Sequence, residues 1–241
     1  MQFERALVPG RLVRRYKRFF ADVELDRAAP GADRVVTAHC PNPGSMRTCA
    51  VEGGRVWLRA ADDPKRRLAW TWELAEVDGA MVVINTARAN RVVEEALRAG
   101  AIAELAGYPA ITREPRAEEG TRFDFLLDGA PRGGRCWLEI KSATMAAGGG
   151  VTAFPDSVTT RGARHLVELA ARRRRGSRAA LLFCVSRSGT RVVRPADEID
   201  PAYGAALRTA AGAGVEILAY QCEIDLTGLR LGARVDVDLR A

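Results

Sequence analysis

Two side chains that could act together in catalysis stand at the end of an apolar run, in CWLEIKSATM (residues 136–145). Glu139 and Lys141 are two positions apart, and residues two apart on a strand point to the same face. Lys141 is one of only three lysines among the 37 lysine and arginine residues. An arginine stays protonated, whereas the compact ammonium of a lysine can hold or activate a water and neutralise charge on a phosphate. By itself the pair also fits an ordinary ion pair on a solvated strand face.

A second carboxylate is predicted to join this pair. The segment RFDFLLDG (122–129) is typical of a strand, with Asp124 between Phe123 and Phe125. Because side chains alternate along a strand, Asp124 should take the face opposite both rings.

The link between the two strands, DGAPRGGR (128–135), is short and rich in turn residues. It predicts a hairpin centred near Pro131–Arg132, in which the numbers of paired residues sum to about 263. That register places Asp124 directly across from Glu139. A slip of one residue would put Asp124 on the wrong face, so the prediction depends on the register.

Two carboxylates this close repel one another, and a hard divalent cation relieves the repulsion. Mg²⁺ binds oxygen ligands and commonly takes one or two carboxylates together with water and substrate phosphates. Asp124, Glu139 and Lys141 on paired strands therefore indicate a metal-dependent phosphodiesterase of the nuclease type. The preceding helix could add an acid, but Glu94 and Glu95 lie equally far from its apolar face, so periodicity does not choose between them.

Basic and aromatic residues elsewhere suit an anionic polymer. RLVRRYKRFF (11–20) mixes cations with aromatic rings, which suits single-stranded or distorted nucleic acid, although aromatics on a strand are as often core residues. The residues predicted to bind there are Arg14, Arg15, Tyr16 and Lys17. In the helix expected at 156–174, Arg161 and Arg164 could grip phosphate. His165 could transfer a proton or bind substrate, or be a partly buried helix histidine.

The elements that must position these residues fall into two groups. Strand and turn patterns recur at roughly ten-residue spacing up to residue 84 and predict a small barrel or sandwich. Beyond it the pattern reads α-β-β-β-α-β-α-β, which gives two domains, 1–84 and 85–241. The segment HCPNPGSM (39–46) predicts a structural turn, and alternatively a turn whose N–H groups face an anion.

The predicted elements rest on simple periodicity. The expected strands of the first domain are at 11–25, 35–40, 53–60, 67–79 and 80–86. Those of the second are at 108–115, 122–129, 135–141, 179–186 and 215–226. Helices are expected at 89–105, with Asn90 as its N-cap, at 155–175, with Asp156 or Ser157 near its start, and at 201–214.

Composition narrows the class of protein. The net charge of +7 over 241 residues favours an anionic partner, with nucleic acid as the first candidate. Five cysteines without a C-x-x-C pair, and only two histidines, argue against a disulfide framework and a structural zinc site. Neither a signal segment nor a membrane span is visible, so a reduced, cytoplasmic protein is expected.

With these residues laid out, the sequence resembles the sugar fermentation stimulation protein A (SfsA) family along nearly the whole chain. The motifs that carry the resemblance are AHCPNPGSM, NRVVEEAL, IAELAGY, RFDFLL, LEIKSAT and FPDSVTTRGARHLVEL. It implies an α/β fold (α+β overall), with an N-terminal OB-like β-barrel followed by a PD-(D/E)xK nuclease-like α/β domain with a mixed central sheet. It also implies DNA binding and a regulatory role in sugar, particularly maltose, utilisation.

Carried over by position, the resemblance makes Asp124 the motif aspartate and Glu139 and Lys141 its E-x-K. It adds a helix glutamate, for which Glu95 is favoured, and the main-chain carbonyl of Ile140 as a further metal ligand. Mg²⁺ or Mn²⁺ is the expected cofactor and DNA the expected partner, with no membrane and a homodimer left open. Two functions follow: a Mg²⁺-dependent nuclease, or a non-catalytic DNA-binding regulator that retains a nuclease-like fold.

Overall fold

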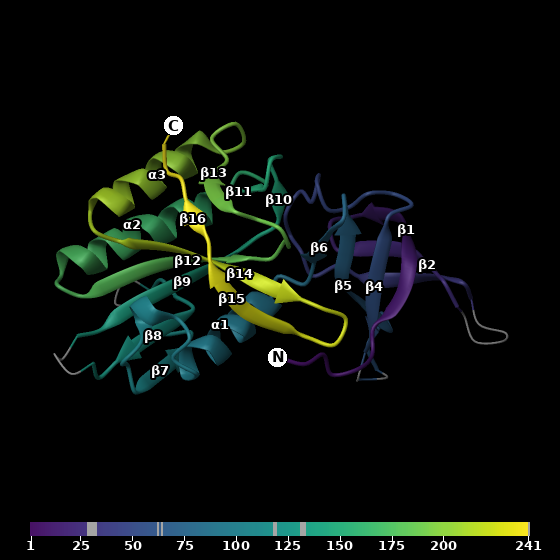
Figure 1. The fold of residues 1–241 in the computed structure, drawn as a ribbon, viewed down its shortest axis with the longest axis horizontal. Helices are drawn as coiled ribbons and strands as arrows, with labels where there is room; N and C mark the ends of the chain where they lie inside the picture. The colour runs from purple at the N-terminus through teal and green to yellow at the C-terminus, as the bar shows by residue number, and fades with distance from the viewer. Residues whose placement is uncertain (28–32, 62, 64, 118–119, 131–133, 241) are drawn as a thin grey trace.

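The computed structural model of the chain describes residues 1–27, 33–61, 63, 65–117, 120–130 and 134–240. Figure 1 shows two parts side by side, with the strands β1 to β6 in one and the remaining elements in the other. The first residues cross from the barrel to the second part. There the N–H of Phe3 donates to the carbonyl of Thr227, and Gln2 bridges Gly228.

The first part is a closed five-stranded barrel. Its strands run in the order β3-β2-β1-β4-β5, pairing of β3 with β5 closes it, and β6 adds to β5. The strands are β1 (Val8–Tyr16), β2 (Phe20–Leu25), β3 (Val35–His39), β4 (Arg55–Ala60), β5 (Trp70–Val77) and β6 (Ala80–Val83). Alternating apolar residues such as Leu12, Val23 and Leu58 fill the interior. Closure leaves few exposed strand edges, and five such strands form the OB architecture predicted from the resemblance.

The second part is built on a mixed sheet of six strands in the order β15-β14-β12-β9-β8-β7. They are β7 (Ala110–Arg113), β8 (Phe125–Asp128), β9 (Cys136–Ala143), β12 (Arg178–Val185), β14 (Glu216–Ile224) and β15 (Leu229–Arg234). β12 runs parallel to both β9 and β14, and its nearly continuous apolar sequence fits a strand covered on both faces. The outer pairs are antiparallel.

Three helices cover this sheet. α1 (Arg88–Arg98) packs on one face, against Leu138, Ile140 and Leu182. α2 (Thr160–Arg174) and α3 (Pro201–Gly212) pack on the other, around residues such as Trp137 and Phe183. Figure 1 shows the sheet between these two layers. Glu139 and Lys141 therefore point toward α2, because they alternate with Leu138 and Ile140.

A small second sheet was not predicted from the sequence. Its order is β10-β11-β13-β16, and its strands are β10 (Met145–Ala146), β11 (Val151–Phe154), β13 (Val192–Pro195) and β16 (Asp236–Val237). Strands of two to four residues carry too little alternation to be recognised by period.

Two helices differ in length from their predictions. α1 ends at Arg98, and Gly100, with φ of +67°, takes the left-handed conformation that ends many helices. A separate 3₁₀ turn spans Ala103–Leu105. Asn90 is not the N-cap but lies inside α1. The helix predicted from residue 156 begins only at Thr160, because the Thr159 side chain accepts from the N–H of Gly162.

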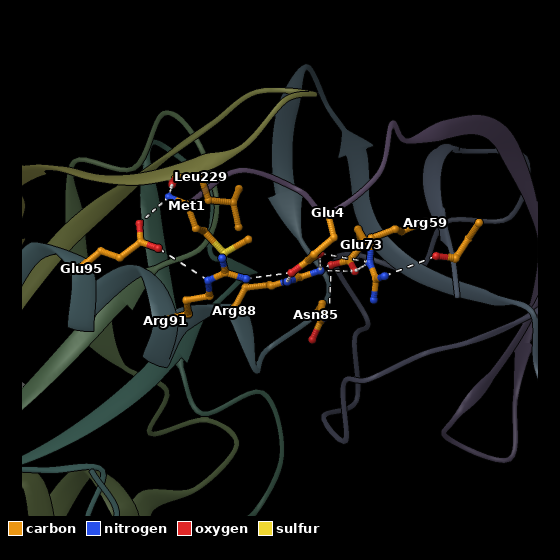
Figure 2. A network of polar contacts seen from close by, with 10 residues as sticks. Met1, Glu4, Arg59, Glu73, Asn85, Arg88, Arg91, Glu95 and Leu229 are labelled. Carbon is orange, nitrogen blue, oxygen red and sulfur yellow. Dashed lines mark hydrogen bonds and ion pairs between the residues drawn. The ribbon is translucent and has the colours of Figure 1, made fainter. Parts of the chain in front are cut away.

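Buried ion pairs join the two parts at their boundary. Glu73 of β5 is fully buried and accepts from Arg59, from Asn85 in the linker and from Arg88 of α1. Arg88 also binds Glu4 in the N-terminal segment. Figure 2 shows this network continuing along the boundary through Arg91, Glu95, Met1 and Leu229. Charged groups from the barrel, the linker and α1 are thus held together.

Apolar residues cross the same boundary. Trp57, Leu74 and Val83 of the barrel belong to one core cluster with α1 and the central sheet. All five cysteines are buried and free. No helix of the part of the chain that the structure describes is long and apolar enough to cross a membrane.

Candidate active site

The predicted register of the central hairpin is confirmed within its strands. β8 pairs antiparallel with β9, with Phe125 opposite Leu138 and Leu127 opposite Cys136. One step beyond the last pair, the same register brings Asp124 opposite Glu139. The predicted turn centre, Pro131–Arg132, lies outside the described residues.

The predicted position of Asp124 relative to its neighbours is wrong. β8 begins only at Phe125, and the chain bends at Asp124, so side chains stop alternating there. Phe123 packs on the α2 side, with its ring 6.0 Å from that of His165, whereas Phe125 packs on the α1 side. The two rings therefore lie on opposite faces, and Asp124 stands at the strand end between them.

Two donors hold the Asp124 carboxylate. The amide of Asn90 donates to Oδ1 at 2.7 Å, and the backbone N–H of Ile140 donates to Oδ2 at 2.7 Å. Burial raises the pKa of Asp124, and the negative charge of Glu139 raises it further, against the lowering effect of these two hydrogen bonds. The carboxylate is thus fixed in direction, and the positive charge of Lys141 offsets the effects of burial and of Glu139 only in part.

Glu139 is bound through only one of its oxygens. Lys141 Nζ donates to Oε1 at 2.6 Å, and Nδ1 of His165 makes a very short contact with the same oxygen. The other oxygen, Oε2, is buried, and none of the described residues donates a hydrogen bond to it. Burial alone would raise the pKa of Glu139, but the hydrogen bond from His165 and the charge of Lys141 outweigh it, and the pKa is lowered. Glu139 is therefore an anion, and one of its two oxygens is available to a further ligand.

His165 of α2 contacts Glu139 and holds its carboxylate in place. Its side chain is only 3% exposed, so the structure does not place it where a nucleic-acid strand could touch it. Arg161 Nε donates to Nε2 of His165 at 3.4 Å, which leaves Nδ1 as the atom that carries the proton toward Glu139. The alternative interpretation, a buried helix histidine, is the better description. Arg164 is exposed and does not line the cavity described next.

A cavity of about 460 Å³ opens beside Lys141, between the two domains. The second domain contributes a floor that includes Asn90, Ile140, Lys141 and Arg161. The barrel contributes a roof made of Arg18 and residues 42–44. Residues 42–44 belong to the loop 40–46 that follows β3, which we call the roof loop. Arg18 was not among the predicted binding residues, although it directly follows them in the sequence. Asn90 was likewise missed, because it was assigned to the helix end.

The roof loop is held from both sides. Arg15 donates to the carbonyls of Asn42, Gly44 and Ser45, so its guanidinium stabilises the loop instead of facing a ligand. From the second domain, the Asp156 carboxylate accepts from the N–H of Met46, and its carbonyl accepts from Ser45 Oγ. The segment 39–46 is thus the structural turn predicted from its sequence, with a docking role that was not predicted.

The other predicted nucleic-acid residues of the barrel are only partly available. Arg14 is paired with Asp22 and lies 4.8 Å from the ring centroid of Tyr16, which itself stacks on Phe20. Lys17 lies in the turn between β1 and β2 with a positive φ. None of these side chains lines the cavity.

The accessory acid of the helix is not where it was expected. Glu95 is half exposed, binds the Met1 amine at 2.7 Å and lines a different cavity. Glu94 is engaged by Arg98 and Arg113. The α1 residue that reaches Asp124 is Asn90, one turn before Glu94 on the same stripe. The prediction of Glu95 is therefore wrong, because the helix presents an amide, not a carboxylate, to Asp124.

The oxygen atoms gathered here fit a hard divalent cation. Asp124, the unpartnered Oε2 of Glu139 and the cavity-lining Ile140 could supply two carboxylates and a main-chain carbonyl. β8 pairing stops opposite Leu138, so it does not cover Ile140. Among the residues that the structure describes, no group of three or more His, Cys, Asp or Glu could hold a metal ion. The donors therefore suit Mg²⁺, which keeps several waters, better than a metal held in a full protein cage.

Comparison with known proteins identifies relatives over the full length. Residues 13–84 match the model described as "SfsA N-terminal OB domain", and residues 87–228 match "Sugar fermentation stimulation protein RE domain". A "Sugar fermentation stimulation protein homolog" of Pseudomonas aeruginosa strain LESB58 is 54% identical over 242 residues, covering 99% of this chain and all of the relative. One of Thioalkalivibrio sulfidiphilus is 51% identical over 240 residues, covering 99% and 98%.

A solved structure shares the fold. It is described as "The structure of Pyrococcus Furiosus SfsA in complex with Ca2+", with a TM-score of 0.87, 26% identity, and coverage of 99% of this chain and 98% of that one. Both family models together span most of the sequence, and the barrel and mixed sheet match the architecture they imply. The chain therefore belongs to the SfsA family.

Proposed function

We propose that this protein is a Mg²⁺- or Mn²⁺-dependent DNA nuclease. One observation carries the proposal: Asp124, Glu139 and Lys141 meet along β9, just beyond its last pair with β8, and Glu139, which is bonded to the cavity-lining Lys141, keeps a buried oxygen without a hydrogen-bond partner among the described residues. A buried, unpaired carboxylate oxygen is costly unless a ligand compensates it. A site of this kind is better explained by a bound cation than by structural stability.

Each residue has a role in this proposal. Asp124 and Glu139 hold the cation together with the carbonyl of Ile140, and Asn90 keeps the Asp124 carboxylate turned toward it. When bound, Mg²⁺ lowers the pKa of a coordinated water and neutralises charge on phosphate oxygens. Lys141, whose ammonium lies within 2.6 Å of Glu139, orients the attacking water or stabilises the charge that develops on the phosphate.

Two further observations support the proposal. The Pyrococcus relative was solved with Ca²⁺, a cation that takes oxygen ligands as Mg²⁺ does. The net charge of +7 and the cations Arg18, Lys141 and Arg161 along the cavity suit a polyanion such as DNA. The relatives' name refers to stimulation of sugar fermentation, and we infer that action on DNA in the cytoplasm underlies a regulatory role in sugar use.

The test is cleavage of single-stranded, nicked, branched and duplex DNA with Mg²⁺ or Mn²⁺. Asp124→Asn and Glu139→Gln should each abolish cleavage, whereas Glu95→Gln, the same kind of change at a carboxylate away from the site, should leave it intact. Equal cleavage by wild type and Asp124→Asn would refute the proposal. No cleavage by any variant, with DNA binding that survives Asp124→Asn without metal, would instead favour the non-catalytic regulator.

A further inference from the structure

The cavity beside Lys141 has walls from both domains, so its width depends on how firmly they are joined. On one side, Asp156 binds the roof loop: its carboxylate accepts from Met46 N–H at 3.0 Å and its carbonyl from Ser45 Oγ at 2.5 Å. A Cβ added at Gly44 would lie 2.3 Å from the Asp156 carboxylate, so the loop and the second domain are already in closest contact.

The far side of the boundary is joined at least as firmly. The buried carboxylate of Glu73 binds Arg88 and Asn85, as Figure 2 shows, and apolar residues continue across the boundary. A backbone hydrogen bond also crosses the boundary: Val83 N–H donates to the carbonyl of Ser186 at 2.8 Å. Opening the cavity by a hinge would separate buried charges, which is strongly unfavourable. The cavity therefore keeps its width.

That width limits what can reach Lys141. A cavity of about 460 Å³ lies in the range that accommodates a drug-sized ligand, on the scale of a nucleotide or two. The major groove alone of a B-form duplex is about 12 Å wide, and enzymes that act deep in a pocket take nucleotides out of the duplex first. A cavity of this volume therefore suits one or two nucleotides of a single strand better than an intact duplex.

The tip of the β1–β2 hairpin is built for such a strand. Lys17 and Arg18 both have positive φ, 45° and 65°, which residues other than glycine rarely adopt. Such strained conformations persist where the surrounding structure enforces them and concentrate at functional sites. At this tip Arg18 lines the cavity, and Phe19, the next residue in the chain, is 43% exposed. A cation next to an available aromatic ring is the composition of single-strand binding surfaces.

The charges of the lining agree with a phosphate backbone. Among the described residues that line the cavity, the cations are Arg18, Lys141 and Arg161, and the acid is Asp156. The three cations therefore outnumber the one carboxylate, whose oxygen accepts from the N–H of Met46 in the roof loop.

We propose that the substrate is a single DNA strand, or an unpaired end, that passes between the barrel and the second domain. Arg18 binds a phosphate and Phe19 stacks on a base, and both position the strand over Lys141. Cleavage of this strand rests on the proposed nuclease function. Binding of the strand does not depend on it.

Binding is measured by fluorescence anisotropy in Ca²⁺, with a labelled strand of about 12 nucleotides, within the site sizes of OB folds. The comparison is a duplex of equal length closed by hairpins at both ends. The strand should bind at least about tenfold more tightly, and Phe19→Ala should weaken it by about tenfold through lost stacking. Arg18→Gln should reduce the slope of log affinity against log salt by about 0.7, one phosphate contact on a single strand.

Matched controls lie on the same hairpin. Arg11→Gln removes an exposed cation that does not line the cavity, and Val13→Ala trims an exposed apolar side chain. Neither should change the preference for the strand. Equal binding of the closed duplex, or equal losses from Arg11→Gln and Arg18→Gln, would overturn the inference.

The cleavage assay separates this inference from the proposed function. A protein that cuts nothing but keeps its preference for the strand, dependent on Arg18 and Phe19, upholds the inference and refutes the nuclease proposal. A protein that cuts the closed duplex as fast as the strand upholds the nuclease and overturns the inference.

Discussion

Replacing Glu73 by glutamine should strongly destabilise the protein. The Glu73 carboxylate is fully buried and accepts four hydrogen bonds, from Arg59, Asn85 and Arg88. The Arg59 and Arg88 side chains are themselves only 11% and 9% exposed. Glu73→Gln leaves two largely buried guanidinium groups with Glu4 as their shared carboxylate. Removing one partner of a buried pair costs about 3 to 5 kcal/mol.

The expected loss is large relative to the stability of a domain. About 3 to 5 kcal/mol is a fifth or more of a typical free energy of unfolding, and it should lower Tm by about 6 to 20 °C in a chain of this size. Because Glu73 joins the barrel to α1, the loss should also uncouple the domains. Urea and thermal unfolding followed by tryptophan fluorescence should then show two transitions where the wild type shows one.

Two further variants test whether the loss comes from breaking a buried charge pair. Glu4→Gln changes a carboxylate that binds the same Arg88 but is 35% exposed, so it should cost no more than about 1 kcal/mol. The double variant Glu73→Met/Arg88→Met removes both charges and should recover part of the loss, since no guanidinium is then left facing an empty partner position at α1. A Glu73→Gln protein within about 1 kcal/mol of the wild type would refute the reasoning that the network locks the domains.

Three other predictions concern the site. His165→Phe removes the donor to Glu139 and should weaken Mn²⁺ binding about 10- to 100-fold in isothermal titration, with His165→Asn recovering part of it; equal affinities would show that His165 does not position Glu139. Asp124→Asn should raise Tm at neutral pH in the absence of metal. The raised pKa of Asp124 means that the wild type loses stability as pH rises from about 4, the ordinary range of an aspartate, through the raised pKa of the folded state, and thermal unfolding of the variant at a series of pH values should lack this loss. Gly44→Ala should displace the roof loop from Asp156 and cost about 1 to 3 kcal/mol, measured by urea denaturation; an unchanged midpoint would contradict the tight contact.

The central hairpin could be predicted because its signals are local. Alternation fixed which residues of β9 share a face, and the turn-rich link fixed the register with β8. Together these two local signals predict that Asp124 lies opposite Glu139. The prediction that Asp124 opposes both Phe123 and Phe125 failed, because alternation holds only inside a strand and the chain bends where β8 begins.

The choice of helix residue failed for a different reason. A helical period tells which residues are buried, but not which neighbour each remaining side chain meets. Asn90, Glu94 and Glu95 all leave the apolar face, and only the packing of α1 on the sheet decides that Asn90 meets Asp124. The contact between the roof loop and Asp156 could not be predicted either. Ser45 and Asp156 lie 111 positions apart, and no local pattern predicts a contact over that separation.

The burial of every cysteine has a practical consequence for experiments on the cavity beside Lys141. Burial raises the pKa of the Cys40 and Cys49 thiols, and that of Cys136 to about 12. A hydrogen bond with Cys184, together with burial, raises the pKa of Cys222, so these four cysteines hold little reactive thiolate at neutral pH. The native chain should therefore resist thiol reagents and mild oxidants without any cysteine being replaced. A single cysteine introduced at Val13, on the exposed outer surface of β1, would carry a spectroscopic label by itself, and its distance to a second label on a bound DNA strand could then be measured.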